Sequence, residues 1–196
     1  MLKELDREAN NVVSLEDPIE YNIEGVNQSQ VRPEIGYDFA SGLRTILRQD
    51  PDIIMVGEIR DKETAAMAIH AALTGHLVLS TLHTNNAAGV VPRLIDMGVD
   101  PYLIAPTLLM VIGQRLVRKL CPDSRKEKFL EGAFKEIAQN ELKNMPDEVR
   151  KKIISFDKIY KGISSSACPM GSKGRVGIFE VLYKTPALES IILTKP

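Results

Sequence analysis

The stretch Ile53–Asp61, IIMVGEIRD, decides how this sequence folds. Its first four residues are aliphatic and mostly β-branched, which favours a strand buried on both faces of a sheet. Gly57 and Glu58 follow at once, so the carboxylate of Glu58 is expected at the carboxyl tip of that strand. A hydrophobic strand ending in an acid is the Walker B arrangement, in which the carboxylate serves the Mg²⁺ shell or the attacking water. The pattern also occurs as an ordinary strand cap, and alone it favours neither interpretation.

Two further apolar runs end in polar residues. Val12–Leu15 runs into Glu16 and Asp17, and Leu77–Thr81 runs into a segment that contains His83. Because the carboxyl ends of parallel strands meet at one edge of a sheet, these side chains are expected near Glu58. The alternative for the acids after the first run is a solvated turn started by Asp-Pro. His70 and His76 are interpreted as structural.

Helical patterns separate these strands. Phe39–Gln49 has apolar residues at helical spacing, with Arg44 and Arg48 four residues apart. Lys62–Leu73 is rich in alanine and is closed by Thr74-Gly75. Further helices are expected over Ala87–Met97 and Tyr102–Leu120. Alternation of strands and helices with polar strand tips is typical of an α/β fold with a parallel sheet.

Composition excludes several classes of protein. The 25 basic and 26 acidic residues nearly cancel, so no net field favours nucleic acid or an anionic membrane. The longest apolar stretch, Tyr102–Gly113, contains a proline and is shorter than the ~20 residues needed to cross a bilayer, so direct membrane insertion is not expected. Two cysteines without an apolar leader indicate a reducing, cytoplasmic compartment rather than a disulfide scaffold.

Five ordered blocks resemble the ATPases that drive type II secretion and type IV pilus assembly. The first three are similar to that family's Asp, Walker B and His boxes, and the last two to its later segments. The blocks are VVSLEDPIEY (12–21), ILRQDPDIIMVGEIRD (46–61), TGHLVLSTLHTN (74–85), QRLVRKLCP (114–122) and GRVGIFEVL (174–182).

The resemblance implies a RecA-like parallel sheet flanked by helices and a site for ATP and Mg²⁺. Glu58 would be the general base or water-positioning acid, and Glu16 would assist it through water or Mg²⁺. His83 would contact the γ-phosphate. The other implied nucleotide-binding residues are Asp17, Thr81 and three arginines that suit phosphate oxygens, namely Arg44, Arg48 and Arg60. Each arginine is alternatively a surface ion-pair partner.

A phosphate-binding loop GxxxxGK[ST] does not occur in the sequence. In the family this loop lies just upstream of the helix with which the sequence starts, so the chain is expected to be a truncated C-terminal portion. We therefore expect the polypeptide alone to bind ATP weakly and not to hydrolyse it measurably. The expected domains are a RecA-like part over 1–120, an inserted lobe over 121–173, and a returning strand with the C-terminal segment over 174–196.

The inserted lobe departs from the family in its metal ligands. Many relatives carry two CxxC pairs there, which suit tetrahedral zinc. Here Ser124 and Ser165 stand where two of the cysteines would be, which leaves Cys121 and Cys168 and makes zinc unlikely. The lobe is expected to be small and mainly helical, with a structural or partner-binding role. Its expected apolar face comprises Phe129, Leu130, Phe134, Ile137, Leu142, Ile153, Ile154 and Phe156.

By resemblance, the partners are other copies in a homohexameric ring and an inner-membrane platform protein of a secretion or pilus system. The ring would be cytoplasmic and peripheral to the inner membrane. Two alternatives remain. One is a pilus-retracting or DNA-translocating motor of the same superfamily, against which the balanced charge and the presence of the lobe both argue. The other is an inactive fragment that interacts with complete subunits.

Overall fold

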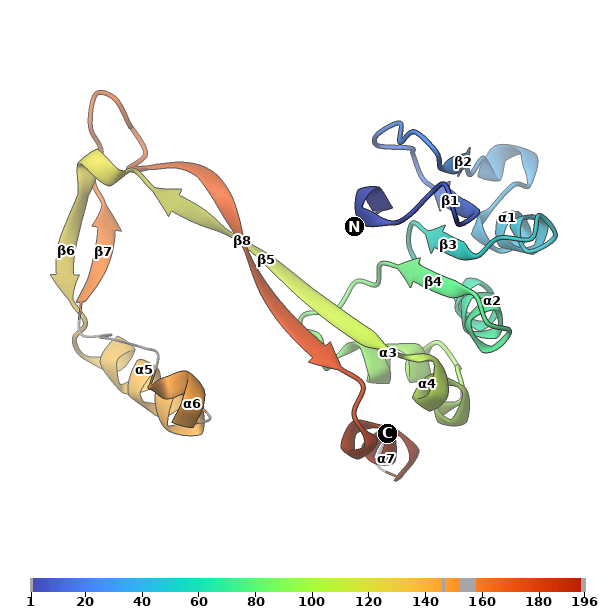
Figure 1. Ribbon diagram of the computed structural model, residues 1–196. Helices are drawn as coiled ribbons and strands as arrows, with labels where there is room; N and C mark the ends of the chain where they lie inside the picture. Colours follow the sequence, from blue (N-terminus) through green and yellow to red (C-terminus); the bar gives the residue numbers. More distant parts are fainter. Residues whose placement is uncertain (1, 146, 152–157, 195–196) are drawn as a thin grey trace. The chain divides into compact units, whose positions relative to one another are not determined.

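Four parallel strands form the sheet on which the rest of the larger unit is built (Figure 1). They are β1 (Val12–Glu16), β2 (Asn27–Gln30), β3 (Ile53–Val56) and β4 (Leu77–Ser80). Their order is β2-β1-β3-β4, and the register places Leu15 of β1 beside Val56 of β3. The predicted α/β fold with a parallel sheet and flanking helices is therefore confirmed.

The computed structural model describes residues 2–145, 147–151 and 158–194. These fall into two units. Unit 1 comprises residues 1–113 and 179–196, and unit 2 comprises residues 114–178. In the described part of the chain, no helix is both long and apolar enough to cross a membrane.

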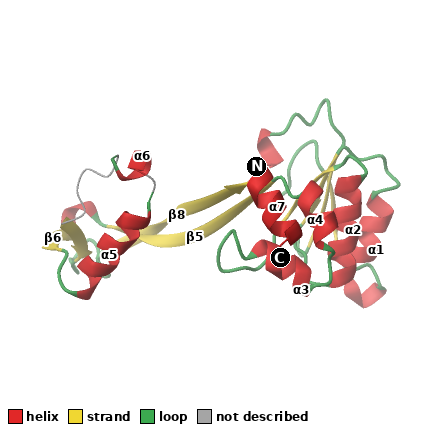
Figure 2. Cartoon of the chain, turned by 90° about the horizontal axis from the view of Figure 1, so that it is seen from below, coloured by secondary structure: helices red, strands yellow, loops and turns green. Residues whose placement is uncertain are grey.

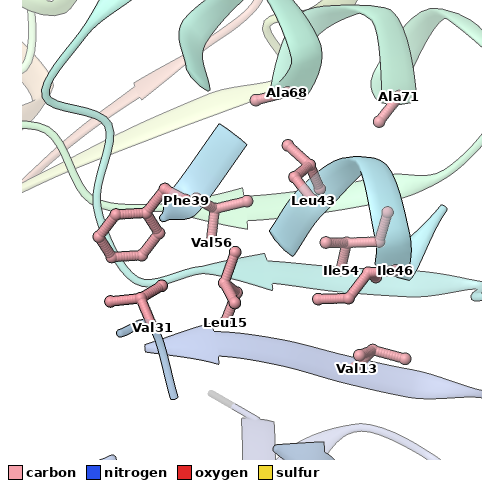
Figure 3. Close-up of a cluster of buried hydrophobic side chains, with 10 residues drawn as sticks. All are labelled: Val13, Leu15, Val31, Phe39, Leu43, Ile46, Ile54, Val56, Ala68 and Ala71. Atoms are coloured by element: carbon pink, nitrogen blue, oxygen red, sulfur yellow. The ribbon is translucent and has the colours of Figure 1, made fainter. Parts of the chain in front are cut away.

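Two helices, α1 (Phe39–Ile46) and α2 (Lys62–Leu73), cover one face of the sheet. Alternate strand residues point toward them and pack into a buried apolar cluster, because successive side chains of a strand project to opposite faces (Figure 3). The cluster consists of Val13, Leu15, Val31, Phe39, Leu43, Ile46, Ile54, Val56, Ala68 and Ala71. Small alanines on α2 let the helix approach the sheet closely.

Polar residues fix where these two helices begin and end. Asp38 and Ser41 form a reciprocal capping box at the start of α1, and the backbone N–H of Ser41 holds the pKa of Asp38 below its ordinary value. Asp61 caps α2 by accepting hydrogen bonds from the backbone N–H and the hydroxyl of Thr64. Gly75, with φ of +100°, follows the end of α2, where glycine is favoured.

Three shorter helices form a second apolar cluster on the other side of α2 (Figure 2). They are α3 (Val90–Asp96), α4 (Pro101–Thr107) and α7 (Pro186–Thr194). Ile104 of α4 and Ile192 of α7 are fully buried between them. Single turns of 3-10 helix complete unit 1 at η1 (Leu2–Glu4) and η2 (Pro33–Ile35).

The helix predicted over Tyr102–Leu120 is wrong beyond Thr107. Residues Met110–Leu120 form strand β5, which pairs with β8 (Ser172–Tyr183). The continuous apolar run hid the change, because a short apolar run does not distinguish a strand from a buried helix. Pro106 and the glycine at 113 favour ending a helix, and Val111, Ile112 and Val117 favour a strand.

Unit 2 holds strands as well as the predicted helix. After the 3-10 turn η3 (Pro122–Ser124), strand β6 (Arg125–Phe129) pairs antiparallel with β7 (Lys158–Gly162). Between them lie α5 (Ala133–Asn144) and α6 (Asp147–Arg150). The expected apolar face does not form a core, because Phe129, Phe134 and Ile137 are exposed to solvent. Ile153, Ile154 and Phe156 lie outside the described residues.

The two cysteines form a disulfide, which corrects the expectation of free thiols. Cys121 and Cys168, separated by 47 positions in the sequence, are joined, and both are buried. Ser165 lies at the same turn, where its hydroxyl accepts a hydrogen bond from the backbone N–H of Cys168. Because the described apolar side chains of unit 2 are mostly exposed, this cross-link is a major constraint on it.

Replacing Gly57 by alanine tests the close approach of β1 and β3. An added Cβ would lie 3.0 Å from the carbonyl oxygen of Leu15 and 3.3 Å from Cα of Glu16, and both are backbone atoms. We expect Gly57→Ala to lower the free energy of unfolding by about 1–3 kcal/mol, measured by urea denaturation. Gly89→Ala is the control, because there the added Cβ meets the side chain of Asn86 at 3.1 Å, which can move. Equal stability of the two variants would contradict this packing.

Removing the disulfide tests what holds unit 2 together. Closing a loop of 47 residues stabilises the folded state by about 4 kcal/mol in the chain-entropy treatment. We expect the double variant Cys121→Ser/Cys168→Ser to speed proteolysis within residues 114–178 and to leave unit 1 resistant. Ser124→Ala/Ser165→Ala is the matched control at the same turns. Identical cleavage rates for the wild type and the cysteine variant would show that the cross-link does not stabilise unit 2.

Candidate active site

The site is built around Glu58, directly beyond the carboxyl end of β3. Its side chain is 13 % exposed, and Oε2 lies 2.6 Å from Nε of Arg60 and 3.4 Å from Nε2 of His83. The Arg60 contact is an ion pair rather than an aligned hydrogen bond, since no described donor makes a well-aligned bond to this buried oxygen. This contact, and to a smaller extent the charge of Asp17, raises the pKa of Arg60 above its ordinary value.

The tips of β3 and β4 are tied together beside this carboxylate. The hydroxyl of Thr81 donates to the carbonyl oxygen of Gly57 at 2.7 Å, and the backbone N–H of Ile59 donates to the carbonyl oxygen of Thr81. Thr81 therefore uses its hydroxyl hydrogen to position the Glu58 loop. His83, two residues further on, is 86 % exposed and offers a donor to a ligand outside the sheet edge.

Glu16 reaches the same sheet edge but is oriented by other residues. The backbone N–H of Gly57 donates to the carbonyl oxygen of Leu15 at 2.7 Å, so the tips of β1 and β3 are adjacent. Oε1 of Glu16 accepts hydrogen bonds from Oγ of Ser14 at 2.6 Å and from Nε2 of Gln28 at 2.8 Å. In the described chain, no hydrogen bond or ion pair joins Glu16 to Glu58.

The other predicted arginines lie apart from Glu58. Arg44 pairs with Glu63 of α2 at 2.6 Å on the surface. Arg48 lies beyond the end of α1, which stops at Ile46 rather than at Gln49 as predicted. The carbonyl oxygen of Gln49 accepts a hydrogen bond from Asn11, which precedes β1, so this segment lies at the amino edge of the sheet. The structure does not bring Arg48 to the Glu58 site.

Among the described residues, no group of three or more histidine, cysteine or acidic side chains is placed to hold a metal ion by itself. Mg²⁺ in phosphate-transferring sites is held by phosphates and waters with only one or two carboxylates. Oε2 of Glu58 is buried and accepts no well-aligned hydrogen bond from a described donor. Glu16 is carried by the adjacent tip of β1. These two carboxylates fit that limited role. The arrangement can therefore position a water or a hydrated cation beside a phosphate.

Sequence reasoning missed the residues that hold these acids in place. Gly57 is required because a side chain would meet the backbone of β1. Ser14 and Gln28 orient Glu16, and Gln28 belongs to β2, which was not predicted. The polar sequence NQSQ gives no strand pattern, whereas the glycine before Glu58 could have indicated a close backbone approach.

The whole chain matches a known family. A family model described as "Type II/IV secretion system protein" matches residues 1–195. The chain is 48 % identical over 192 residues to the type II secretion system ATPase E of Vibrio cholerae, covering 97 % of this chain and 36 % of that protein. It is 49 % identical over 185 residues to the type IV pilus assembly ATPase PilB of Pseudomonas aeruginosa, covering 93 % and 31 %. The chain thus spans about a third of the length of these relatives.

Solved structures of motor ATPases have the same fold. The pilus retraction motor PilT with bound ADP is similar with a TM-score of 0.63 and 29 % identity, covering 94 % of this chain and 41 % of that one. The ATPase DotB of Yersinia pseudotuberculosis is similar with a TM-score of 0.64 and 25 % identity, covering 99 % and 40 %. This chain belongs to the type II/IV secretion system ATPase family, with the motor ATPase fold of its structural neighbours.

Proposed function

We propose that this chain supplies the catalytic-acid half of an ATP-hydrolysing site in a hexameric motor for type II secretion or type IV pilus assembly. The observation that carries the proposal is the Glu58 carboxylate held beside Arg60 and His83 at the carboxyl edge of a parallel sheet. Relatives named for secretion and pilus assembly are more similar in sequence than the retraction motor, which favours the first two roles over retraction.

In this proposal Glu58 orients the attacking water and accepts its proton. His83, which is exposed at the tip of the next strand, donates a hydrogen bond to the γ-phosphate. Arg60 balances the charge of Glu58 and can turn toward phosphate oxygens when a nucleotide binds. Mg²⁺, when bound, would neutralise charge on the β- and γ-phosphates, with Glu16 serving its hydration shell.

The phosphate cradle must come from polypeptide outside these residues, and the free edge of β4 is where it fits. The N–H of Leu77 donates to Asp52, which precedes β3, so Leu77 and Leu79 direct their backbone groups toward β3. Val78 and Ser80 therefore direct theirs to the open edge. A strand added there would end beside Thr81 and His83, whereas one added beside β2 would have two strands, β2 and β1, between it and β3.

The handedness of the fold supports the same placement. A strand beyond β4 that continues through a helix to β1 would make a right-handed crossover, which puts the helix on the face opposite α1 and α2. On that face, Leu77 of the edge strand β4 is 38 % exposed, whereas Val12 of the inner strand β1 is buried. A helix following the added strand would cover Leu77 and Leu79.

The purified 196-residue chain is expected to show no measurable ATP hydrolysis, because it contains no phosphate-binding loop. Adding a strand–GxxxxGK[ST]–helix segment in trans should form a complex and restore turnover. Glu58→Gln should then lower that rate by about 100-fold or more and leave the complex intact. The measurements are phosphate release and size-exclusion chromatography of the mixture.

Ser80→Pro is the matched edge variant. Its lost N–H faces the open edge rather than β3, so the chain should still fold while the added segment no longer binds. Steady hydrolysis by the 196-residue chain alone, abolished by Glu58→Gln, would contradict the need for an external cradle. A restored rate that Glu58→Gln does not change would contradict the role of Glu58.

A further inference from the structure

The total charge of the chain is nearly balanced, but the two units carry net charges of opposite sign. Unit 2 contains fifteen lysines and arginines against eight acids, whereas the rest of the chain contains ten against eighteen. No anionic partner was expected from the sum over the whole chain. Unit 2 by itself has an excess of seven positive charges, which is large for a unit of 65 residues.

One face of the β6–β7 hairpin satisfies its own charges. Lys158 pairs with Glu127 at 2.7 Å, and this contact raises the pKa of Lys158 above its ordinary value. The guanidinium of Arg125 lies 4.6 Å from the ring centre of Tyr160, and the ammonium of Lys158 lies 5.8 Å from that of Phe129. Both aromatic rings of the hairpin are thus engaged within the protein.

The opposite face of the β6–β7 hairpin carries lysines that have no acidic partner among the described residues. Lys126 and Lys161 are directly paired across the strands, and Lys128 is directly paired with Ile159. We call these four residues the lysine face. All four are exposed, and no described residue forms an ion pair with any of the three lysines. Like charges directly opposite on a sheet destabilise it, so an anionic partner would remove an unfavourable interaction.

We propose that the lysine face binds the phosphate groups of an anionic phospholipid surface. Three ammonium groups on one side of a short hairpin match a plane of repeated phosphate anions, and Ile159 places an aliphatic group among them. Nucleic acid fits less well, because single-stranded binding stacks successive bases on several free aromatic rings, and both rings of the hairpin lie on its other face and are already engaged. The inference does not depend on the proposed ATPase function.

Exposed apolar side chains follow the hairpin closely in sequence, at the beginning of α5. Only three residues separate the end of β6 at Phe129 from the start of α5 at Ala133. Phe134 and Ile137 project from the first turns of the helix and are 75 % and 58 % exposed. Glu141 lies on the same side one turn further, which limits shallow insertion to the beginning of the helix.

The test is co-flotation of the full chain with two kinds of vesicle. One kind is phosphatidylcholine alone, and the other has equal parts of phosphatidylcholine and phosphatidylglycerol. We expect binding only to the anionic vesicles, with affinity falling as salt rises. The triple variant Lys126→Gln/Lys128→Gln/Lys161→Gln should bind about 100-fold more weakly, because each lysine near such a surface contributes about fivefold.

Two variants make the test specific. Lys3→Gln/Lys62→Gln/Arg93→Gln changes the net charge equally within unit 1 and should bind like the wild type. Lys126→Glu should melt at the same or a higher temperature, because it replaces the Lys126–Lys161 repulsion by attraction, and should still lose binding. Equal binding to both vesicles, equal losses for the two triple variants, or binding of the lysine face to single-stranded DNA but not to vesicles would overturn the proposal.

Discussion

The parallel pairing of β1, β3 and β4 is the constraint on which the candidate site depends. It forces three strands to end at one edge, and the hydrogen bond from Gly57 to Leu15 brings the tips of β1 and β3 into contact. The hydroxyl of Thr81 then fixes the tip of β4 to the same loop. With this framework in place, Glu58 and His83 meet although 25 positions separate them in the sequence. The apolar layer under α1 and α2 keeps the strands in register.

The strong periodic elements could be predicted from the sequence, and the weak or ambiguous ones could not. β3 and α2 begin and end where expected, because an aliphatic run and an alanine-rich run each have clear stop signals. β2 was missed because NQSQ is a polar edge strand. β5 was taken for a helix because its apolar residues continue directly from α4.

The same division holds for the site. Glu16, Glu58 and His83 were expected at one sheet edge, because each follows an apolar run. The structure places Nε2 of His83 3.4 Å from Oε2 of Glu58, because strand ends are readable from sequence. Arg48 was assigned to the same site by the family resemblance, yet α1 ends before it and the chain turns toward the amino edge. The orientation of Glu16 by Gln28 depends on a strand pairing that no local pattern indicates.

The two units are stabilised in different ways. Unit 1 has two buried apolar clusters, whereas in the described part of unit 2 the disulfide and the hairpin contacts stand in for a core. The charge is divided along the same boundary. An acidic unit that carries the proposed catalytic carboxylate and a basic unit with an unpaired lysine face suit the two proposed tasks, nucleotide chemistry in one and surface contact in the other.

We propose above that Glu58 activates water in a site whose phosphate cradle lies outside this chain. The most direct measurement is the ATPase rate of a chimera in which these residues replace the matching third of the Vibrio cholerae relative. We expect the chimera to hydrolyse ATP, and we expect its Glu58→Gln version to fold and bind ATP but to turn over about 100-fold or more slowly. A folded Glu58→Gln chimera with an unchanged rate would show that Glu58 does not activate the water.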